Sequence, residues 1–524
     1  MTVAKVATPY GTWASPITAG MIADTTISLS SVLVDGSDIY WLEGRPSEGG
    51  RVVLMRRTDT GPVDVLPTGY SARSRVHEYG GGAAIVSGGV AFFVNFEDQR
   101  IYRLEDGGVP EAISPDTGDR HADMFHDVAR TRLVCVRERH VDDAMVNELI
   151  AVDLDSGGCT ALVEGHDFVS NPRISPNGTT LSWIGWDLPD MPWDSAALWV
   201  APIGLDGDVG PGAKLAGGKG VSVFQPTWAP DESLVFAVDP DGWWNLHRWD
   251  GTEVSSICSM EAEFGLPQWV FGMRTFDVNP SGAIVTAYTR DGAWQLAFID
   301  EGALQRIDVP YTDIAAPQWV DDKIIFIGSS AHAASAILLL DPASGAIETL
   351  RTSLTADLDT DGLSVPSSIS FETTDGDTAY GFYYPPMSAT NISPQDERPP
   401  LIVRGHGGPT GATSPSFSLA IQFWTSRGFA VLDVNYRGST GFGRGYREAL
   451  YGRWGEADVD DMVRGAEHLV ASGQADPARL AIRGGSAGGY TALAALAFRD
   501  TFSGGASLYG IGDLMTLARD THKF

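Results

Sequence analysis

Length and composition set the first limits on this protein. The 524 residues exceed what one hydrophobic core usually supports, and 43% hydrophobic with 20% charged residues is typical of a globular chain. With 36 Lys and Arg against 67 Asp and Glu, the net charge of −31 would repel polyanions, so nucleic acid is excluded as an expected partner. The 3 cysteines lack metal-binding spacing, and neither a disulfide framework, a metal nor a cofactor is expected.

The N-terminal stretch "MTVAKVATPYGTWASPITAG" has no apolar core next to a basic flank, as a signal peptide would. No apolar run approaches the roughly 20 residues that cross a bilayer. The sequence therefore predicts a cytoplasmic protein that does not bind membranes. Residues 1–25 are expected to form a separate segment that packs on the C-terminal domain.

Residues 26–350 repeat a short β-rich run, a turn of Asp, Gly, Asn or Pro, and another run. Seven runs recur at spacings of roughly 40 to 53 residues, the size of one four-stranded propeller blade. One blade cannot bury both of its faces, whereas blades in a ring can. The pattern predicts an all-β propeller, seven-bladed by the count of runs, with a stacked pair of β-sandwiches as the alternative. The runs are "DIYWLEG", "VAFFVNF", "RLVCVRE", "TLSWIGW", "SLVFAVD", "AIVTAYT" and "KIIFIGS".

The pattern changes after a linker expected at residues 351–367, and residues 368–524 alternate strands with helices. A hairpin that turns at Asp375-Gly376 is followed by strands at 401–405, 430–436, 479–484 and 504–510. Helices are expected within 416–426 and 456–472, the second with an apolar stripe at i, i+3, i+4 and i+7. This alternation predicts a mostly parallel sheet covered by helices, the α/β class.

The stretch "GGSAG" at 484–488 lies between a predicted strand and a predicted helix and fits G-x-S-x-G. In that context Ser486 would occupy a tight turn with its hydroxyl free, as a nucleophile requires. Glycine at 484 and 488 would relieve crowding on either side of the turn. The alternative is a glycine-rich turn that binds phosphate or nothing, but the lysine of a phosphate loop is missing. The helix after the serine, "YTALAALAF", is expected to pack inside.

A second glycine-rich loop, "RGHGGPTG" at 404–411, follows an earlier strand of the same sheet. An oxyanion hole needs the N–H after the nucleophile and a second N–H from such a loop. We therefore expect the donors to be Ala487 N–H and Gly408 N–H, with Gly407 as the alternative to Gly408. His406 is expected to orient this loop rather than to act as the base.

Several motifs together resemble the prolyl oligopeptidase family of serine peptidases, and most of all its acylaminoacyl-peptidase and dipeptidyl-aminopeptidase branch. The resemblance implies a propeller lying over the active site of an α/β-hydrolase domain. It also implies hydrolysis of short peptides, because the propeller screens out folded proteins. The motifs, in order along the chain, are "VHEYGGG", "MPWD", "HGGP", "DVNYRGSTGFG", "DVDDM" and "GGSAGG".

The chain departs from that family after the serine. The order in α/β-hydrolases is Ser, Asp, His, with the acid and base after later strands. The candidates downstream of Ser486 are Asp500, Asp513, Asp520 and His522, and neither role is assigned to any of them. The expectation is therefore that the C-terminal part of the catalytic domain, roughly 100 residues or more, is missing. The fragment itself is then expected to be inactive, because loss of one triad member can cost on the order of 10⁶ in rate.

Four residues are weaker candidates for substrate binding. Glu261 and Glu263 in "MEAEFGLPQWVFG" could hold the free amine of a substrate, as an acidic pair does in dipeptidyl-peptidase relatives; a solvated or structural turn is the alternative. Tyr436 and Arg437 in "NYRGS" could bind substrate, or form a core contact and a structural salt bridge.

These patterns together predict a serine peptidase that cleaves short peptides through an acyl-enzyme on Ser486. One alternative is an esterase or lipase on the same scaffold, because fold does not decide substrate. The other is a propeller that only binds, with an inactive hydrolase remnant, if the chain naturally ends at Phe524. Short peptides are the expected partners, and the sequence leaves homo-oligomerisation open.

Overall fold

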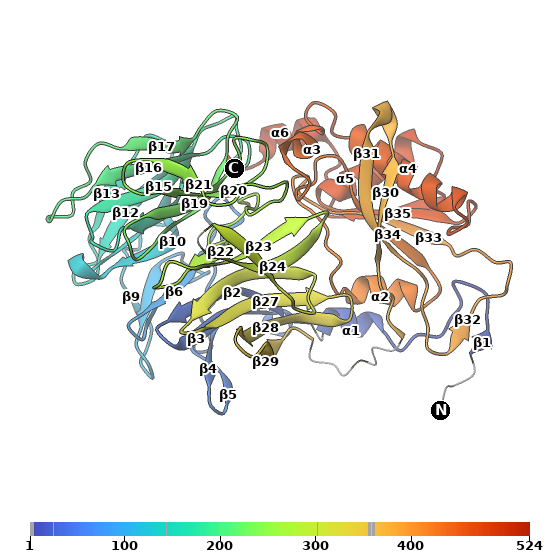
Figure 1. Ribbon diagram of the computed structural model, residues 1–524, viewed down its shortest axis with the longest axis horizontal. Coiled ribbons are helices and arrows are strands. Elements are labelled where there is room, and N and C mark those ends of the chain that lie inside the picture. The colour runs from blue at the N-terminus through green and yellow to red at the C-terminus, as the bar shows by residue number, and fades with distance from the viewer. Residues whose placement is uncertain (1–4, 25, 143, 301, 355–357, 359–361) are drawn as a thin grey trace.

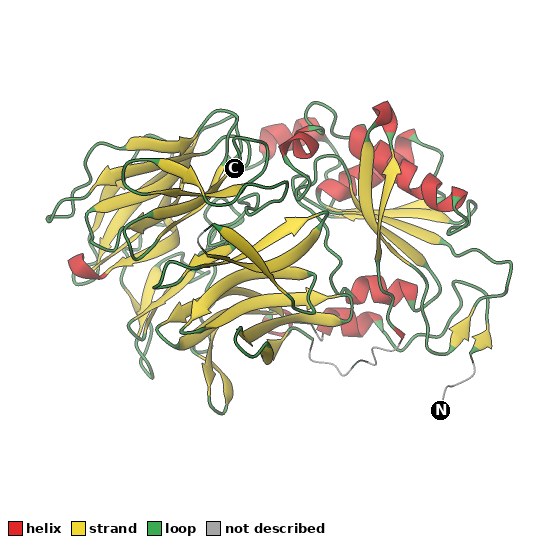
Figure 2. Ribbon diagram, viewed as in Figure 1, coloured by secondary structure: helices red, strands yellow, loops and turns green. Residues whose placement is uncertain are grey.

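A computed structural model describes residues 5–24, 26–142, 144–300, 302–354, 358 and 362–524. Figure 1 shows two parts side by side, a ring of small sheets built by residues 26–354 and an α/β part built by the residues after them. Figure 2 shows that strands dominate the first part and that the longer helices lie in the second. Residues 355–357 and 359–361 of the expected linker lie outside the described residues. No helix among the described residues is long and apolar enough to cross a membrane.

The first part contains seven four-stranded antiparallel sheets within the described residues, which confirms the seven-bladed propeller. Each run singled out in the sequence is the second strand of one blade. The first four blades are β2 (Ser28–Asp35), β3 (Asp38–Arg45), β4 (Arg51–Thr58) and β5 (Gly61–Asp64); β6 (Ala84–Ser87), β7 (Val90–Val94), β8 (Ile101–Leu104) and β9 (Glu111–Ala112); β10 (Arg120–Asp127), β11 (Arg132–Val141), β12 (Ala144–Asp153) and β13 (Cys159–Val163); and β14 (Phe168–Ile174), β15 (Thr180–Trp186), β16 (Ala197–Pro202) and β17 (Ala213–Gly217). The last three are β18 (Val223–Trp228), β19 (Leu234–Val238), β20 (Asn245–Trp249) and β21 (Val254–Ser256); β22 (Phe276–Val278), β23 (Ile284–Arg290), β24 (Ala293–Asp300) and β25 (Ala303–Ile307); and β26 (Asp313–Val320), β27 (Lys323–Ser330), β28 (Ala333–Asp341) and β29 (Ala346–Thr352).

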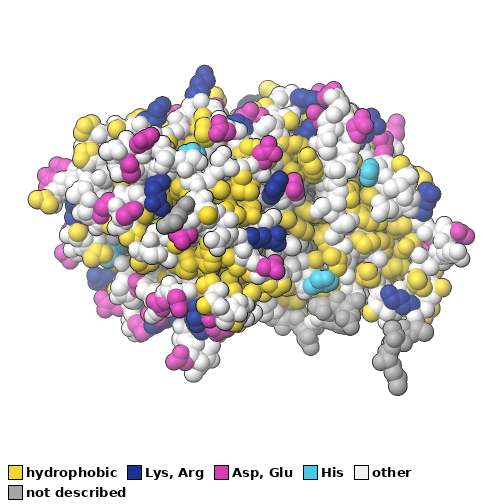
Figure 3. Space-filling model, viewed as in Figure 1, with side chains coloured by type: hydrophobic (Ala, Val, Ile, Leu, Met, Phe, Trp, Pro, Cys, Tyr) yellow, Lys and Arg dark blue, Asp and Glu magenta, His cyan; other side chains and the backbone are white. Residues whose placement is uncertain are grey.

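The ring closes where the first blade packs on the last. Trp41 and Val53 of the first blade share one buried cluster with Ile325 and Ile337 of the last blade. Such contacts bury the second face of each sheet, which a single blade could not do alone. The surface in Figure 3 mixes acidic and basic side chains around hydrophobic ones on the face shown.

The α/β part is built on a six-stranded sheet in the order β30-β31-β34-β33-β35-β36. The hairpin and the parallel strands agree with the sequence prediction, and Asp375 at the hairpin turn has φ 67°. The strands are β30 (Ser367–Glu372), β31 (Thr378–Tyr384), β33 (Leu401–Gly405), β34 (Ala430–Asn435), β35 (Leu480–Gly485) and β36 (Gly504–Leu508); the helices are α2 (Leu419–Thr425), α3 (Arg444–Glu448), α4 (Ala457–Ala471), α5 (Ala487–Phe498) and α6 (Leu514–Asp520).

Helix α4 buries the apolar stripe that its spacing predicts, including Val459, Met462 and Leu469. The expectation for α5 was wrong in part. Its alanine-rich side is buried, but Leu493 and Phe498 are exposed, at 41% and 74%. The reason is its position beside β36, the edge strand of the sheet, where no other described element covers that side of the helix.

The N-terminal segment lies along the α/β part. Strand β1 (Val6–Ala7) pairs in parallel with β32 (Asn391–Ile392), and helix α1 (Ala19–Asp24) follows it. Ser15 Oγ lies 2.7 Å from Ser426 Oγ, and Arg427 donates to the carbonyl of Ile17 at 2.8 Å. These contacts tie residues before the propeller to residues after it.

Candidate active site

Ser486 occupies the sharp turn between β35 and α5. Its backbone angles, φ of 54° and ψ of −121°, lie outside the regions that residues other than glycine ordinarily adopt. Such a conformation costs on the order of 1–3 kcal/mol and persists only where neighbouring structure imposes it. Here Ser486 N–H donates to the carbonyl of Leu508 at 3.1 Å, while the serine carbonyl accepts from Tyr490 at the start of α5. The hydroxyl is partly exposed and has no hydrogen-bond partner among the described residues.

The glycines around the serine are required by close backbone approaches. A Cβ on Gly484 would clash with the carbonyl of Gly488. One on Gly488 would clash with the carbonyl of Gly405 and lie 2.6 Å from that of His406. One on Gly489 would lie 2.7 Å from the Cα of Gly510. Because each obstacle is backbone, a side chain could not be accommodated by a rotamer change. The turn is therefore possible only with this glycine pattern.

The glycine-rich loop after β33 lies against this turn. A Cβ on Gly407 would be 3.5 Å from Ser486 Cβ, whereas one on Gly408 would meet only Thr410 at its nearest contacts. The backbone N–H groups of Gly407, Gly408 and Ala487 donate to no acceptor within the described part of the chain. These free amides are the donors that an oxyanion needs. The proximity favours Gly407, the alternative donor, over Gly408.

His406 is committed to holding this loop. Its Nδ1 lies 2.8 Å from the Gly407 carbonyl, which can only accept, so Nδ1 carries the proton. Nε2 lies 2.7 Å from the Ser439 hydroxyl, whose single proton is shared between this nitrogen and the Tyr436 carbonyl, also at 2.7 Å. The ring stacks on Tyr436 at 4.3 Å, and burial lowers the pKa of His406. Both ring nitrogens of a neutral imidazole are therefore occupied, which fits the orienting role expected for this residue.

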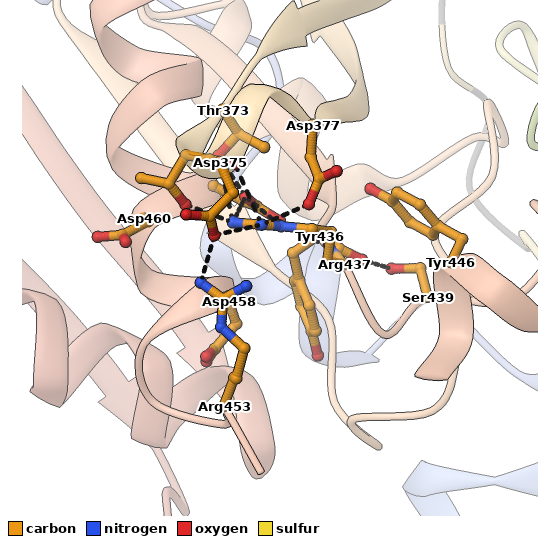
Figure 4. Close-up of polar contacts among 12 residues, drawn as sticks. Thr373, Asp375, Asp377, Tyr436, Arg437, Ser439, Tyr446, Arg453, Asp458 and Asp460 are labelled. Carbon is orange, nitrogen blue, oxygen red and sulfur yellow. Dashed lines mark hydrogen bonds and ion pairs between the residues drawn. The ribbon is translucent and has the colours of Figure 1, made fainter. Parts of the chain in front are cut away.

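Tyr436 and Arg437 are buried in structural contacts, and the substrate-binding hypothesis for them does not fit their surroundings. Tyr436 is fully buried and donates to the His406 carbonyl at 3.0 Å. Arg437 is 1% exposed and pairs with Asp461 and Asp377, each at 2.9 Å. Figure 4 shows the guanidinium of Arg437 directed at the hairpin carboxylates. The core contact and the structural salt bridge that were the alternatives describe both residues.

The two glutamates proposed as an amine anchor have different surroundings. Glu261 is exposed, whereas Glu263 is 1% exposed. The Glu263 carboxylate accepts from Trp244 N–H at 2.9 Å and from Gly443 N–H at 3.2 Å. Burial raises the pKa of Glu263 to about 7. The structure thus places Glu263 as a link between a propeller blade and the α/β part, and its oxygens are already occupied.

Sequence reasoning missed the polar network that joins the two parts beside Glu263. Asp239 of the propeller pairs with Arg444 at 2.6 Å and with Arg447 at 3.1 Å, and both Asp239 and Arg447 are buried. Tyr451 of the α/β part donates to the carboxylate of Asp194. Asp194 lay in the motif "MPWD" and Asp239 ended the run "SLVFAVD", but neither pattern indicated a partner. The partners are more than 200 residues apart in the chain, so no local pattern could have revealed the pairing.

A second link runs from the propeller to the glycine-rich loop. The indole N–H of Trp269 donates to the carbonyl of Thr410 at 2.5 Å. The same ring packs on Trp193 with a centroid distance of 4.4 Å. A propeller side chain therefore holds the loop that carries the candidate oxyanion donors.

The acidic and histidine candidates downstream of Ser486 form no hydrogen bond with it. Asp513 caps α6 by accepting from Met515 and Thr516. His522 lies edge-on to Tyr79 at 5.3 Å, on the propeller side. These placements agree with assigning neither triad role to Asp513 or His522.

Comparison with known proteins places this geometry in a family. The family model described as "Prolyl oligopeptidase family" matches residues 415–524. The structure of a puromycin-hydrolyzing peptidase of Mycobacterium tuberculosis is 34% identical with a TM-score of 0.95, and the match covers 99% of this chain and 83% of that one. A puromycin hydrolase structure is 36% identical with a TM-score of 0.93, covering 98% and 82%.

Among curated proteins, dipeptidyl aminopeptidase BIII of Pseudoxanthomonas mexicana is 38% identical over 130 residues. That match covers 25% of this chain and 19% of the relative, so the curated similarity spans a small part of the relative's length. It is the solved structures that extend the likeness over both parts of the molecule. The chain belongs to the prolyl oligopeptidase family of serine peptidases.

Proposed function

We propose that this protein is a serine peptidase that cleaves short peptides through an acyl-enzyme on Ser486. The observation that carries the proposal is the Ser486 hydroxyl, which is free of hydrogen bonds at a strained turn and lies beside unpaired backbone amides. In the proposed reaction, Ser486 Oγ attacks the scissile carbonyl and its proton passes to a general base. The amides of Ala487 and Gly407, or Gly408, receive the charge that develops on the carbonyl oxygen. Collapse expels the amine, and water then releases the acid.

The base is the part of this mechanism that the described residues do not supply. His406, on the glycine-rich loop beside the turn, is held by Gly407 and Ser439 and has no hydrogen bond to Ser486. In α/β-hydrolases the acid and the base follow the serine in the sequence. Labelling of the serine is therefore best measured on protein purified from its natural source.

The propeller supports short peptides as the substrate class. It is joined to the α/β part through Glu263, Asp239 and Trp269, so it would restrict a folded protein from reaching the serine. Relatives named for dipeptidyl aminopeptidase and puromycin-hydrolysing activity make short peptides and puromycin the first substrates to test. We also keep the cytoplasm as the proposed compartment, with Cys135, Cys159 and Cys258 all free.

Labelling by a fluorophosphonate probe tests the nucleophile directly. Protein purified from its natural source should be labelled, with the modified peptide containing Ser486, and recombinant Ser486→Ala protein of the same length should not. Peptide anilides should be hydrolysed faster than nitrophenyl esters of matched acyl groups. Faster ester hydrolysis would indicate the esterase alternative. Natural protein that is not labelled at Ser486 would contradict the peptidase and favour a propeller that only binds.

A further inference from the structure

The propeller contains a cavity of about 490 Å³ between the inner strands of its blades, and this cavity is open to solvent. The wall comes from the inner strands of several blades, including β2, β10, β14 and β18, and no residue of the α/β part contributes to it. The cavity is therefore separate from Ser486 and from the glycine-rich loop. Its volume lies within the range of about 300 to 1,000 Å³ that holds small ligands.

Breaks in the inner strands direct polar residues to this cavity. Strands β2, β10, β14 and β18 each contain a bulge where the pairing register shifts. Each bulge has one residue with φ between 50° and 53°, namely Ser31, Asp123, Asn171 and Gln225. A bulge redirects a side chain that a regular strand would point elsewhere. The same device in four of the seven blades adds polar residues to the wall of this cavity.

Most of the polar groups in this wall already have partners. Gln225 donates to the Phe276 carbonyl at 2.7 Å and accepts from Thr275 N–H at 2.6 Å. Asp123 accepts from Asn171 N–H at 2.6 Å and from Arg173 at 3.2 Å. These groups are parts of the scaffold and leave little capacity for a ligand.

Two groups of the wall are exceptions. The side-chain oxygen of Asn171 is buried without a partner among the described residues, and the other exception is Arg274. It lines the cavity, its side chain is 28% exposed, and its guanidinium donates no hydrogen bond to any described residue. The nearest carboxylate, on Asp277, is 3.9 Å away and accepts instead from Trp319 N–H at 3.0 Å. Burial lowers the pKa of Arg274; Asp277 opposes this shift, and Arg173, the second cation of the wall, adds to it. A guanidinium with its donors free beside another cation is a site for an anion.

Two further observations restrict the anion. The carboxylates of Asp123 and Asp277 equal the two arginines in number, so these four groups carry no net formal charge, which disfavours a multiply charged ligand. The rest of the wall includes Val32, Met124 and Met273, so a ligand with an apolar body would bury it there. A carboxylate on a small, partly apolar molecule meets both conditions.

We propose that this propeller cavity binds the C-terminal carboxylate of a short peptide, with Arg274 as the principal donor and Arg173 beside it. The peptide's apolar side chains would lie against Val32, Met124 and Met273. The site would recognise peptides independently of the chemistry at Ser486, and it carries a function for the propeller besides restricting access.

Calorimetric titration of the full chain carrying Ser486→Ala measures this binding without turnover. The probes are acetyl-alanyl-leucine as the free acid, the same dipeptide as its C-terminal amide, and inorganic phosphate. The acid should bind, and the amide should bind at least about tenfold more weakly, because it removes a charge-assisted hydrogen bond. Arg274→Gln should weaken binding of the acid by at least about tenfold.

Arg306→Gln is the matched control. It makes the same change on β25 of the same blade, where the side chain is 59% exposed and outside the cavity, and it should bind the acid as the parent does. Thermal unfolding verifies that both variants fold. The proposal is overturned if the acid does not bind, if acid and amide bind equally, or if Arg274→Gln retains the parent affinity. Phosphate binding as tight as that of the acid would overturn the assignment to a peptide carboxylate. Because Ser486 is absent from all these proteins, the outcome is independent of whether the proposed peptidase activity is correct.

Discussion

The propeller and the α/β part organise their residues in opposite ways. Seven blades repeat one arrangement, and the buried residues of each strand can be exchanged for similar ones without changing the plan. Around Ser486, by contrast, single positions are decisive, because Gly484, Gly488 and Gly489 each meet backbone where a Cβ would stand. The comparison shows that the propeller tolerates exchange of many buried residues, whereas the serine turn depends on particular residues at particular positions. We expect stability to be most sensitive to substitution at the junction of the two parts, where buried charged residues of one part are paired with residues of the other.

The largest effect is expected at that junction. Asp239→Asn removes the buried anion that faces Arg444 and Arg447, and it leaves two cations with less compensation. Breaking a buried pair in this way costs about 3–5 kcal/mol, which urea unfolding would measure. The matched control is Glu467→Gln, whose pair with Arg464 is about half exposed and should change stability by less than about 1 kcal/mol. Similar losses in both variants would show that the two parts do not depend on the Asp239 contact.

Next in size is Gly488→Ala. The added methyl group meets the carbonyls of Gly405 and His406, which belong to the neighbouring strand and loop and cannot rotate away. Overpacking of this kind costs about 1–3 kcal/mol, and it should displace Ser486 enough to abolish its labelling by a fluorophosphonate probe. Gly512→Ala is the control, because a Cβ there meets nothing within 4 Å. Labelling that survives Gly488→Ala would contradict the close packing described at this turn.

A third prediction concerns pH. Burial raises the pKa of Glu263 from 4.5 to about 7, so the folded state holds this proton more tightly than the unfolded state does. The contribution of Glu263 to stability is thus full below pH 4.5 and is lost as pH rises towards 7. Between pH 5 and pH 7 the loss is about 2 kcal/mol. Urea unfolding of the parent should show this slope relative to Glu263→Gln, and equal slopes in the two proteins would indicate that Glu263 is ionised throughout.

The smallest effect is expected for Trp269→Phe. The substitution keeps an aromatic ring near Trp193 but removes the hydrogen bond to the Thr410 carbonyl, worth about 1 kcal/mol. It should slow fluorophosphonate labelling, because the loop that carries the candidate oxyanion donors loses its tether. Trp319→Phe is the control, since the indole N–H of Trp319 is buried without a partner in the described residues. Equal labelling rates in the two variants would argue that the tether has no bearing on the site.

The propeller and the serine turn could be predicted from sequence because their signals are local. The seven runs are short and evenly spaced, and the glycines stand next to Ser486 in the chain. The bulges at Asp123 and Asn171 could not be predicted. The alternation of side chains along a strand does not show at which residue the pairing with the next strand will shift. The exposed side of α5 could not be predicted either. An alanine-rich sequence predicts a buried helix whether or not another element covers its outer side.

Charged residues were the least predictable part of the site. Arg437 and Glu263 look the same in sequence whether they face solvent, a substrate or a buried partner. Their surroundings depend on Asp461, Asp377 and Gly443, which only the fold brings near. A carboxylate or guanidinium in a motif therefore identifies a position worth testing, and its role follows from its partners.

The bond between Trp269 and Thr410 has a consequence for how a substrate could enter. If the propeller and the α/β part separate to admit a peptide, Trp269 must release the glycine-rich loop. The backbone amides of that loop would then lose their alignment with Ser486. Admission and reaction would then exclude each other in time. The open form would admit a peptide but could not cleave it, and only the closed form would be catalytically competent.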